Sequence, residues 1–284
     1  MRNIVFSAGS MGGLTFVGAW KALEEQGVTQ KLVGFSGCSM GSIMALLTSI
    51  GYSGEELKSM AYVLNYNDLS ELQIFSALAN LGLDTGNKIA YLLRELLERK
   101  TGKKHLTFQE HYYITGRKLW VNASCVEDDK CYYYSMDTTP NMDIVLAVRM
   151  SIALPWIIAA VRHNGSTYID GGFHDPCPVH MFPTNETLVL RVKNDHSVDP
   201  ESHEFIRHTS NILFSAYRRL HQHLSETLNK YTCILLDSKI GSISLDVSKK
   251  ERKRLVKIGY QTLRTWLRAN YRDTSNESCA ASNS

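Results

Sequence analysis

Short apolar runs alternate with helical patterns through the N-terminal part of the chain. Asn3–Ser7 is an apolar run of strand length, and a second run spans Lys31–Ser36. Between them a helical spacing of apolar residues continues from Leu14 to Gly27, and Met40–Ile50 is a further apolar helical pattern. Strand, turn and helix in repeated order are typical of a parallel sheet covered by helices. The pattern therefore predicts an α/β fold.

The rest of the chain continues this mixture of elements. Strand-like runs lie at 119–125, 131–136, 156–161, 167–169, 188–192 and 231–236, and helical patterns lie at 87–100, 143–151 and 201–229. A polar turn joins the first two of these strands, which predicts a hairpin. Ser53 with Glu56, and Ser248 with Glu251, have the spacing of a capping box, so we expect a helix to begin at each. We place the main domain at 1–245, a basic amphipathic helix at 246–272, and a small polar tail, expected to be disordered, at 273–284.

The first candidate for chemistry is the turn between the second strand and its helix. Gly37-Cys38-Ser39-Met40-Gly41 has the form G-x-S-x-G. A serine at such a turn is pushed clear of the backbone, and the crowding requires residues without a Cβ two before and two after it. The following helix points its positive end at the serine and favours an anion there. The motif predicts a nucleophilic Ser39, with a plain glycine-rich turn as the alternative.

A nucleophilic serine needs a base, and the sequence leaves two arrangements open. In a Ser-Asp-His triad an acid would be followed by a histidine, for which the chain offers His174, His180, His196, His203, His208, His221 and His223. In a dyad the carboxylate itself takes the serine proton. Asp170 fits that role, because Gly171 and Gly172 let the backbone fold tightly behind it. No histidine is singled out by its surroundings, which favours the dyad.

From residue 4 to about 185 the chain resembles the patatin-like phospholipases. The resemblance rests on the glycine-rich loop Phe6–Gly13, Gly18 and the helix at Ala22–Glu25, the Gly37–Gly41 turn, Gly51–Ser53, Glu55–Leu57, Thr138–Pro140, Ala147–Arg149, Ser151, Pro155 and Asp170–Gly172. It implies a three-layer α/β sandwich whose mostly parallel central sheet has helices on both faces. It also implies a Ser39–Asp170 dyad, no metal or other cofactor, and hydrolysis of lipid acyl esters.

In this family the glycine-rich loop aims backbone N–H groups at the oxyanion of the intermediate. The resemblance assigns that oxyanion hole to Gly9, Ser10 and Met11, supported by Gly13. The loop departs from the family pattern, because Ala8 and Ser10 replace glycines and Gly12 stands where a basic residue is expected. A patatin-like protein that binds lipid without turning it over is therefore the non-enzymatic alternative. Residues 60–105 are the expected place for a lid or an acyl pocket.

Charge adds a second candidate surface. The net charge of +3 is too small to indicate a nucleic-acid partner, but nine Lys or Arg and one acid lie between Lys249 and Arg272. A basic amphipathic segment with a tryptophan predicts peripheral contact of 249–272 with an anionic membrane, and packing on the domain is the alternative. The six scattered cysteines have no metal-like spacing, so we expect free thiols. Without an apolar leader or membrane-length run, we expect a cytoplasmic protein that acts on a lipid substrate.

Overall fold

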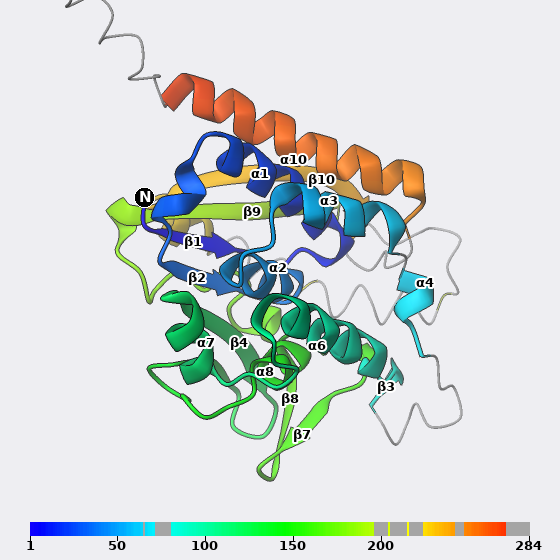
Figure 1. The fold of residues 1–284 in the computed structure, drawn as a ribbon. Coiled ribbons are helices and arrows are strands. Elements are labelled where there is room, and N and C mark those ends of the chain that lie inside the picture. The colour runs from blue at the N-terminus through cyan, green and yellow to red at the C-terminus, as the bar shows by residue number, and fades with distance from the viewer. Residues whose placement is uncertain are drawn as a thin grey trace, which may run out of the picture.

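The fold is a mixed α/β arrangement in which helices flank a central sheet (Figure 1). It was obtained as a computed structural model, which describes residues 1–64, 66–71, 81–195, 204, 215, 224–241 and 247–270. The expected helix at 201–229 lies mostly outside the described residues, and the tail at 273–284 lies wholly outside them. No helix within the described ranges combines the length and the apolar character that crossing a membrane requires.

Eight strands form the central sheet within the described part of the chain. Their order is β10 (Thr232–Gly241), β9 (Thr187–Asp195), β1 (Asn3–Phe6), β2 (Gly34–Gly37), β4 (Lys118–Cys125), β8 (Ser166–Asp170) and β7 (Val161–His163), with β5 (Lys130–Ser135) paired to β4. Neighbours from β10 to β4 are parallel, whereas β5, β8 and β7 run antiparallel to their partners. The expected parallel sheet is therefore confirmed for its central strands, and an antiparallel end is added to it.

The helices follow the predicted order closely. They are α1 (Leu14–Glu25), α2 (Met40–Ser49), α3 (Gly54–Val63), α4 (Tyr66–Leu69), α6 (Asn87–Thr101), α7 (Phe108–Thr115), α8 (Ile144–Ser151) and α10 (Lys249–Asn270), with 3-10 turns η1 (Ser10–Gly13), η2 (Val28–Lys31), η4 (Gly171–Phe173) and η5 (Thr184–Glu186). The capping box of Ser53 and Glu56 is formed at the start of α3. At the start of α10 only the Glu251 N–H bonds Ser248, because the Glu251 carboxylate pairs with Arg254 instead.

One predicted strand divides differently from its pattern. The strand-like runs 156–161 and 167–169 flank a turn at Asn164-Gly165. In the structure only Val161–His163 forms a hairpin with β8, whereas β6 (Trp156–Ile158) pairs with β3 (Gly82–Asp84) in a separate two-stranded sheet. Ala159 and Ala160 connect the two pairings, and Trp156 begins β6 with a positive φ of 64°. The hairpin predicted at 119–125 and 131–136 is confirmed as β4 and β5.

Successive side chains of β1 point to opposite faces of the sheet and belong to two hydrophobic cores. Ile4 and Phe6 belong to the main cluster between the sheet and helices that include α1 and α2. Val5 faces the opposite side, where Cys177, Phe182 and Leu228 cover the sheet in a smaller cluster. All three β1 side chains are fully buried. The sheet is thus buried on both faces, as expected for parallel strands.

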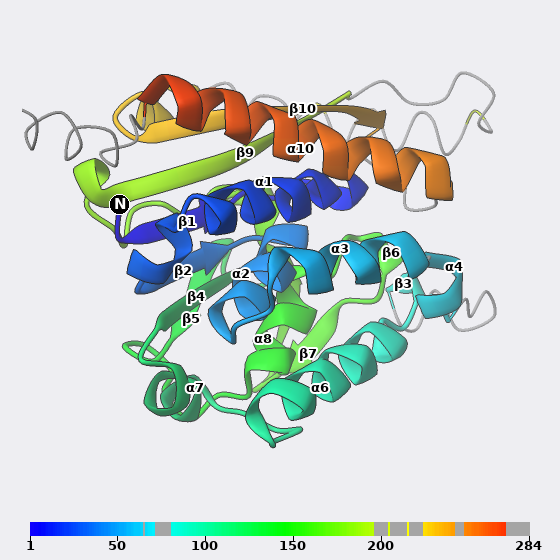
Figure 2. The ribbon, with the colours of Figure 1, turned by 45° about the horizontal axis from the view of Figure 1, so that its top comes forward.

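The C-terminal helix α10 lies along α1 (Figure 2). The two backbones approach closely at two glycines: a Cβ atom at Gly18 would overlap with the Val256 carbonyl, and one at Gly259 would overlap with the Thr15 carbonyl. Val256 and Leu263 join the main core cluster. The segment that the sequence suggested as an appendage therefore shares its core with the first helix.

This contact generates a stability prediction. Gly259→Ala forces α10 away from α1, because the new methyl group meets a backbone carbonyl that has no room to move. We expect a loss of about 1–3 kcal/mol in the free energy of unfolding, measured by urea denaturation. Thr265→Ala, at an exposed position of the same helix, serves as the control and should change it by less than about 0.5 kcal/mol. Equal effects of the two substitutions would contradict close packing at Gly259.

Candidate active site

Ser39 lies at the sharp turn between β2 and α2. Its backbone has φ 54° and ψ −125°, a conformation that is strained for a residue with a side chain. A Cβ at Gly37 would overlap with the Gly41 carbonyl, and a Cβ at Gly41 would lie 2.5 Å from the Ser7 carbonyl oxygen. Close backbone approach, rather than positive φ, therefore excludes side chains at both glycines.

Hydrogen bonds hold the strained turn in place. The Ser39 N–H donates to Ser151 Oγ at 2.9 Å, and the Ser42 hydroxyl donates to the Ser39 carbonyl at 2.6 Å. The first of these bonds joins the turn to α8, whose last residue is Ser151. Ser39 also precedes the first turn of α2, where the helix dipole favours negative charge. The turn is thus fixed from two elements, and its electrostatics suit an anion.

The pairing along β4 explains how Asp170 reaches Ser39. β5 occupies one edge of β4 from Trp120 to Cys125, so β2 and β8 must share the opposite edge. β2 ends with Gly37 opposite Val121, and β8, running the other way, ends with Asp170 opposite Ala123. The ends of the two strands therefore converge on neighbouring residues of β4. Two sequence motifs far apart in the chain meet at one point of the sheet.

Asp170 is a buried carboxylate with few partners. It is 4% exposed, and its Oδ1 accepts a hydrogen bond from the Gly172 N–H at 2.8 Å. Burial raises its pKa to about 6, against the opposing effects of hydrogen bonds from the Ser39 side chain and the Gly172 N–H. A Cβ at Gly171 would lie 2.6 Å from the Asn122 carbonyl oxygen, so this glycine is required for close approach. The Ser39 side chain thus lies near enough to act on the Asp170 carboxylate, and Gly171 and Gly172 support that carboxylate.

Cys38 lies beneath this pair. Its thiol is fully buried and points at the Asp170 carboxylate, with 4.0 Å between Sγ and Oδ1. Burial, together with the negative charges of Asp170 and Asp175, raises the pKa of the Cys38 thiol well above its usual range. The thiol therefore stays protonated and acts as a weak donor to the carboxylate. The described cysteines, this one included, are free, as expected.

The triad candidates that the structure describes, His174 and His180, do not pair with Ser39 or Asp170. His174 Nε2 lies 3.0 Å from Asp129 Oδ1, and His180 Nδ1 lies 3.7 Å from Asp175 Oδ2. Neither histidine hydrogen-bonds Ser39 or Asp170. The remaining five candidates, His196, His203, His208, His221 and His223, lie outside the described residues. Within the described residues, Ser39 therefore has a carboxylate partner and no imidazole partner.

The glycine-rich loop lies beside the serine turn. Its residues Ser10–Gly13 form a 3-10 turn, and a Cβ at Gly13 would overlap with the Met40 side chain. Ser10 and Met11 open this turn, where a helical turn provides no acceptor for their N–H groups. Gly9 has an extended φ of −170° and contacts Val192 closely. The N–H groups of Ser10 and Met11 are therefore free of helical partners.

Within the described part of the chain, Ser10 has a strained backbone and an unpaired hydroxyl in the altered loop. Its φ of 44° lies in the left-handed region, which favours the glycine that the family pattern places there. Its hydroxyl is buried and has no hydrogen-bond partner among the described residues. The loop thus keeps its shape at the expense of local strain and one unsatisfied polar atom.

Asn194 and Ser238 occupy the space that a basic side chain at position 12 would need. A Cβ at Gly12 would overlap with Asn194 Oδ1 and lie 2.9 Å from Ser238 Oγ. Asn194 Nδ2 donates to the Gly9 carbonyl at 2.9 Å, and the Ser238 hydroxyl donates to Asn194 Oδ1 at 2.7 Å. These two side chains, from β9 and β10, therefore fill the space of the missing side chain and hold the loop. Neither residue lies in a motif, so no pattern in the chain predicts this contact.

An apolar cavity of about 170 Å³ adjoins the serine turn. Residues of the glycine-rich loop, α1, α2, α3, α4, α6 and α10 line it: Met11, Leu14, Val17, Met40, Ile43, Met44, Leu47, Leu57, Met60, Ala61, Leu64, Leu69, Ile89, Leu92, Leu93, Leu96 and Arg252. Eight of these fall within 60–105, where an acyl pocket was expected. A cavity of similar size in another protein holds benzene, so this one suits several carbons of an alkyl chain.

The apolar side of α10 does not face solvent. Leu263 and Leu267 are buried, whereas Lys249, Lys250, Lys253 and Lys257 are exposed. The amphipathic pattern thus reflects packing on the domain.

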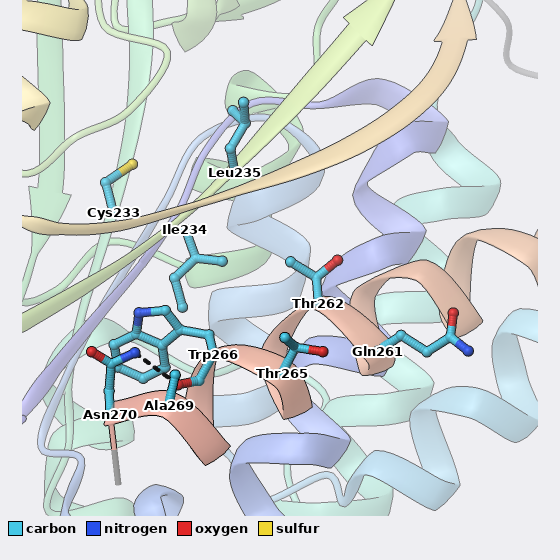
Figure 3. A pocket seen from close by; sticks show the side chains of 9 residues that line it. All are labelled: Cys233, Ile234, Leu235, Gln261, Thr262, Thr265, Trp266, Ala269 and Asn270. Atoms are coloured by element: carbon cyan, nitrogen blue, oxygen red, sulfur yellow. Dashed lines mark hydrogen bonds between the residues drawn. The ribbon is translucent and has the colours of Figure 1, made fainter.

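A second hollow, between β10 and the far half of α10, is an open groove into which Ile234 points beside Trp266 (Figure 3). It involves none of the residues at the serine turn. The described His, Cys, Asp and Glu side chains form no group of three placed to hold a metal ion.

The strain at Ser10 generates a prediction that a pair of substitutions can isolate. Ser10→Gly permits the left-handed conformation, whereas Ser10→Ala keeps the steric conflict and removes the same hydroxyl. We expect the glycine variant to be more stable than the alanine variant by about 1 kcal/mol in urea unfolding. A glycine variant less stable than the alanine variant would contradict the strained geometry.

The chain is similar in sequence to proteins of two viruses. The chain is 29% identical over 185 residues to "Probable lipid hydrolase 463L" of Invertebrate iridescent virus 6, which covers 63% of this chain and 62% of the viral one. It is 24% identical over 279 residues to the uncharacterized protein R571 of Acanthamoeba polyphaga mimivirus, covering 93% of each chain.

Solved structures show the same fold. VipD from Legionella pneumophila has a TM-score of 0.61 at 16% identity, over 94% of this chain and 67% of that one. The type III effector ExoU of Pseudomonas aeruginosa has a TM-score of 0.55 at 16% identity, over 94% and 53%. A family model described as patatin-like phospholipase matches residues 4–183, more than half of the chain. The chain therefore belongs to the patatin-like phospholipase family.

Proposed function

We propose that the protein is a lipid acyl hydrolase of the phospholipase A or lysophospholipase type, with Ser39 as nucleophile and Asp170 as base. The observation that carries the proposal is the convergence of the ends of β2 and β8 on β4, which places Ser39 near the buried Asp170 carboxylate. An apolar cavity next to this pair, lined by Met11 and Met40, supports a substrate with an alkyl chain. The viral relative that is described as a probable lipid hydrolase supports the same class of reaction.

The first step of the proposed mechanism forms an acyl-enzyme. The ionised Asp170 accepts the proton of the Ser39 hydroxyl while its oxygen attacks the ester carbonyl. The resulting oxyanion is stabilised by the N–H groups of the glycine-rich loop, those of Ser10 and Met11 above all, and by the start of α2. The tetrahedral intermediate then collapses, and the leaving alcohol takes the proton from Asp170.

The second step releases the acyl group. Water gives a proton to the Asp170 carboxylate as it attacks the acyl-enzyme, and the fatty acid leaves when the Ser39 oxygen recovers that proton. The fixed N–H groups stabilise both tetrahedral intermediates without reorganising. Strain at Ser10 affects the loop that carries these donors, so turnover depends on the support that Asn194 gives the loop.

Contact with an anionic membrane remains part of the proposal in a narrower form. Because α10 buries its apolar side, the contact would use charge alone, through Lys249, Lys250, Lys253 and Lys257. These lysines lie on the half of α10 that carries Arg252, which lines the apolar cavity. The surface would therefore bring the cavity toward the lipid layer.

The dyad is tested by two substitutions with matched controls. Ser39→Ala and Asp170→Asn should each lower fatty-acid release from phosphatidylcholine and lysophosphatidylcholine by about a thousandfold or more, because each removes a reacting group. Ser59→Ala and Asp137→Asn change exposed residues of the same types and should retain activity. Fluorophosphonate labelling of the wild type that disappears in Ser39→Ala identifies the nucleophile. Absence of labelling in folded wild type would favour a lipid-binding protein, and loss of activity on replacing a histidine would favour a triad.

The pKa of Asp170 predicts opposite effects of pH on activity and on stability. As the base it must be ionised, so kcat/KM should fall as the pH drops below about 6. Its folded-state pKa lies above the ordinary value of 3.8, so ionising it destabilises the folded protein, and this cost is complete above pH 6. Asp170→Asn should therefore raise the free energy of unfolding by roughly 1–3 kcal/mol at pH 8, and by less at pH 5. A gain that does not grow with pH would contradict a raised pKa.

A further inference from the structure

The apolar cavity next to Ser39 has one charged side chain in its wall. Arg252 extends from α10 and is 6% exposed, whereas the other lining residues are Met, Leu, Ile, Val and Ala. A buried charge is costly unless it is paired and hydrogen-bonded. Its place in this cavity therefore requires an explanation.

Arg252 has fewer partners than a buried guanidinium needs. Nη1 donates to the Val247 carbonyl at 2.8 Å, and Nη2 lies 3.5 Å from the Tyr62 carbonyl oxygen. Nε is buried without any hydrogen-bond partner, and no acidic side chain pairs with Arg252 among the residues that the structure describes. Two positions along the helix, by contrast, Arg254 pairs with Glu251. Among the described residues, the positive charge of Arg252 thus has no counterion.

The free part of the guanidinium has a defined shape. The Nε and Nη2 hydrogens point in the same direction, and this edge is unbonded at Nε and only weakly engaged at Nη2. Arginine uses such an edge to bind two oxygens of one phosphate or carboxylate. The available edge therefore matches an oxyanion rather than a neutral hydroxyl.

We propose that Arg252 binds the oxyanion of a lipid whose alkyl chain lies in the apolar cavity. The chemistry is shared by a phosphate ester and a fatty-acid carboxylate, and both carry the group next to an alkyl chain. Met11 and Met40 line the same cavity, so the bound lipid lies beside the serine turn. This assignment rests on the proposed lipid-hydrolase function for its biological meaning. It adds a residue, from outside the part of the chain matched by the family model, that selects lipids with an anionic group.

A purely structural role for Arg252 makes a different prediction. Tyr62 is near the C-terminal end of α3, where helix carbonyls lack partners, and Arg252 could act there only as a cap. A cap explains the Nη contacts but not the unpartnered Nε in the cavity wall. Removing a cap would lower the stability of the protein and would affect the binding of charged and neutral ligands equally. Removing an oxyanion contact would weaken the binding of anionic amphiphiles only.

The test measures binding in a Ser39→Ala background, so that no probe can be turned over. Dodecyl phosphate and dodecanoate, each below its critical micelle concentration, and dodecanol, below its solubility limit, are titrated by calorimetry. Arg252→Met removes the charge at similar length, and Arg252→Lys keeps the charge without the paired edge. Arg268→Met is the matched control, since it makes the same replacement at an exposed position of the same helix. Thermal unfolding establishes that each variant is folded.

We expect Arg252→Met to weaken binding of an anionic probe at least about tenfold and that of dodecanol less than threefold. Arg252→Lys should give an intermediate loss, and Arg268→Met should give none. An effect on dodecyl phosphate assigns the site to a phosphate head, and an effect on dodecanoate alone assigns it to a fatty acid. An equal loss for dodecanol, or no loss for either anion, would overturn the proposal. Should Arg252→Met not fold, the comparison of Arg252→Lys with Arg268→Met decides in the same way. Because binding is measured without turnover, this result is independent of whether Ser39 acts as a nucleophile.

Discussion

The candidate site depends on the way two strands share one edge of β4. β2 occupies the first part of that edge and β8 the second, so their ends converge although one strand is parallel to β4 and the other antiparallel. Ser39 follows the first strand and Asp170 ends the second. Burial of the carboxylate at this junction raises its pKa to about 6. The geometry that brings the two groups together thus also makes Asp170 a stronger base than an exposed carboxylate.

The residues that could be predicted from the sequence are those whose identity is constrained by their immediate neighbours in the chain. Gly37 and Gly41 are required by backbone contacts within and beside one turn, so a short motif reveals them. Asp170 was placed by its two following glycines and by resemblance to a family. Strand and helix patterns located most elements, since burial on one or both faces leaves a clear period. The division of 156–163 between two sheets had no such period, because the runs are only three residues long.

The residues that were missed act through contacts between distant segments. Asn194 on β9 bonds the Gly9 carbonyl, and Ser238 on β10 bonds Asn194, but nothing in the neighbouring sequence indicates either contact. Arg252 was counted as one of nine basic residues in a segment, whereas the structure separates it from them by burial. The same segment shows why an amphipathic pattern is ambiguous. Its apolar residues fit a membrane surface or a protein core equally well, and only the close approach at Gly18 and Gly259 decides for the core.

The space beside Gly12 has a consequence for how this loop can vary between related proteins. Asn194 Oδ1 fills the position that a side chain at residue 12 would need, and Ser238 fixes the asparagine there. A basic residue at position 12 and an asparagine at position 194 are therefore mutually exclusive in this fold. A side chain introduced at position 12 alone would collide with Asn194, and loss of Asn194 alone would leave the loop without support. The effects of substitutions at the two positions therefore depend on each other. Homologues should carry one solution or the other, and chimeras that mix the two halves of the chain should lose the loop before they lose the sheet.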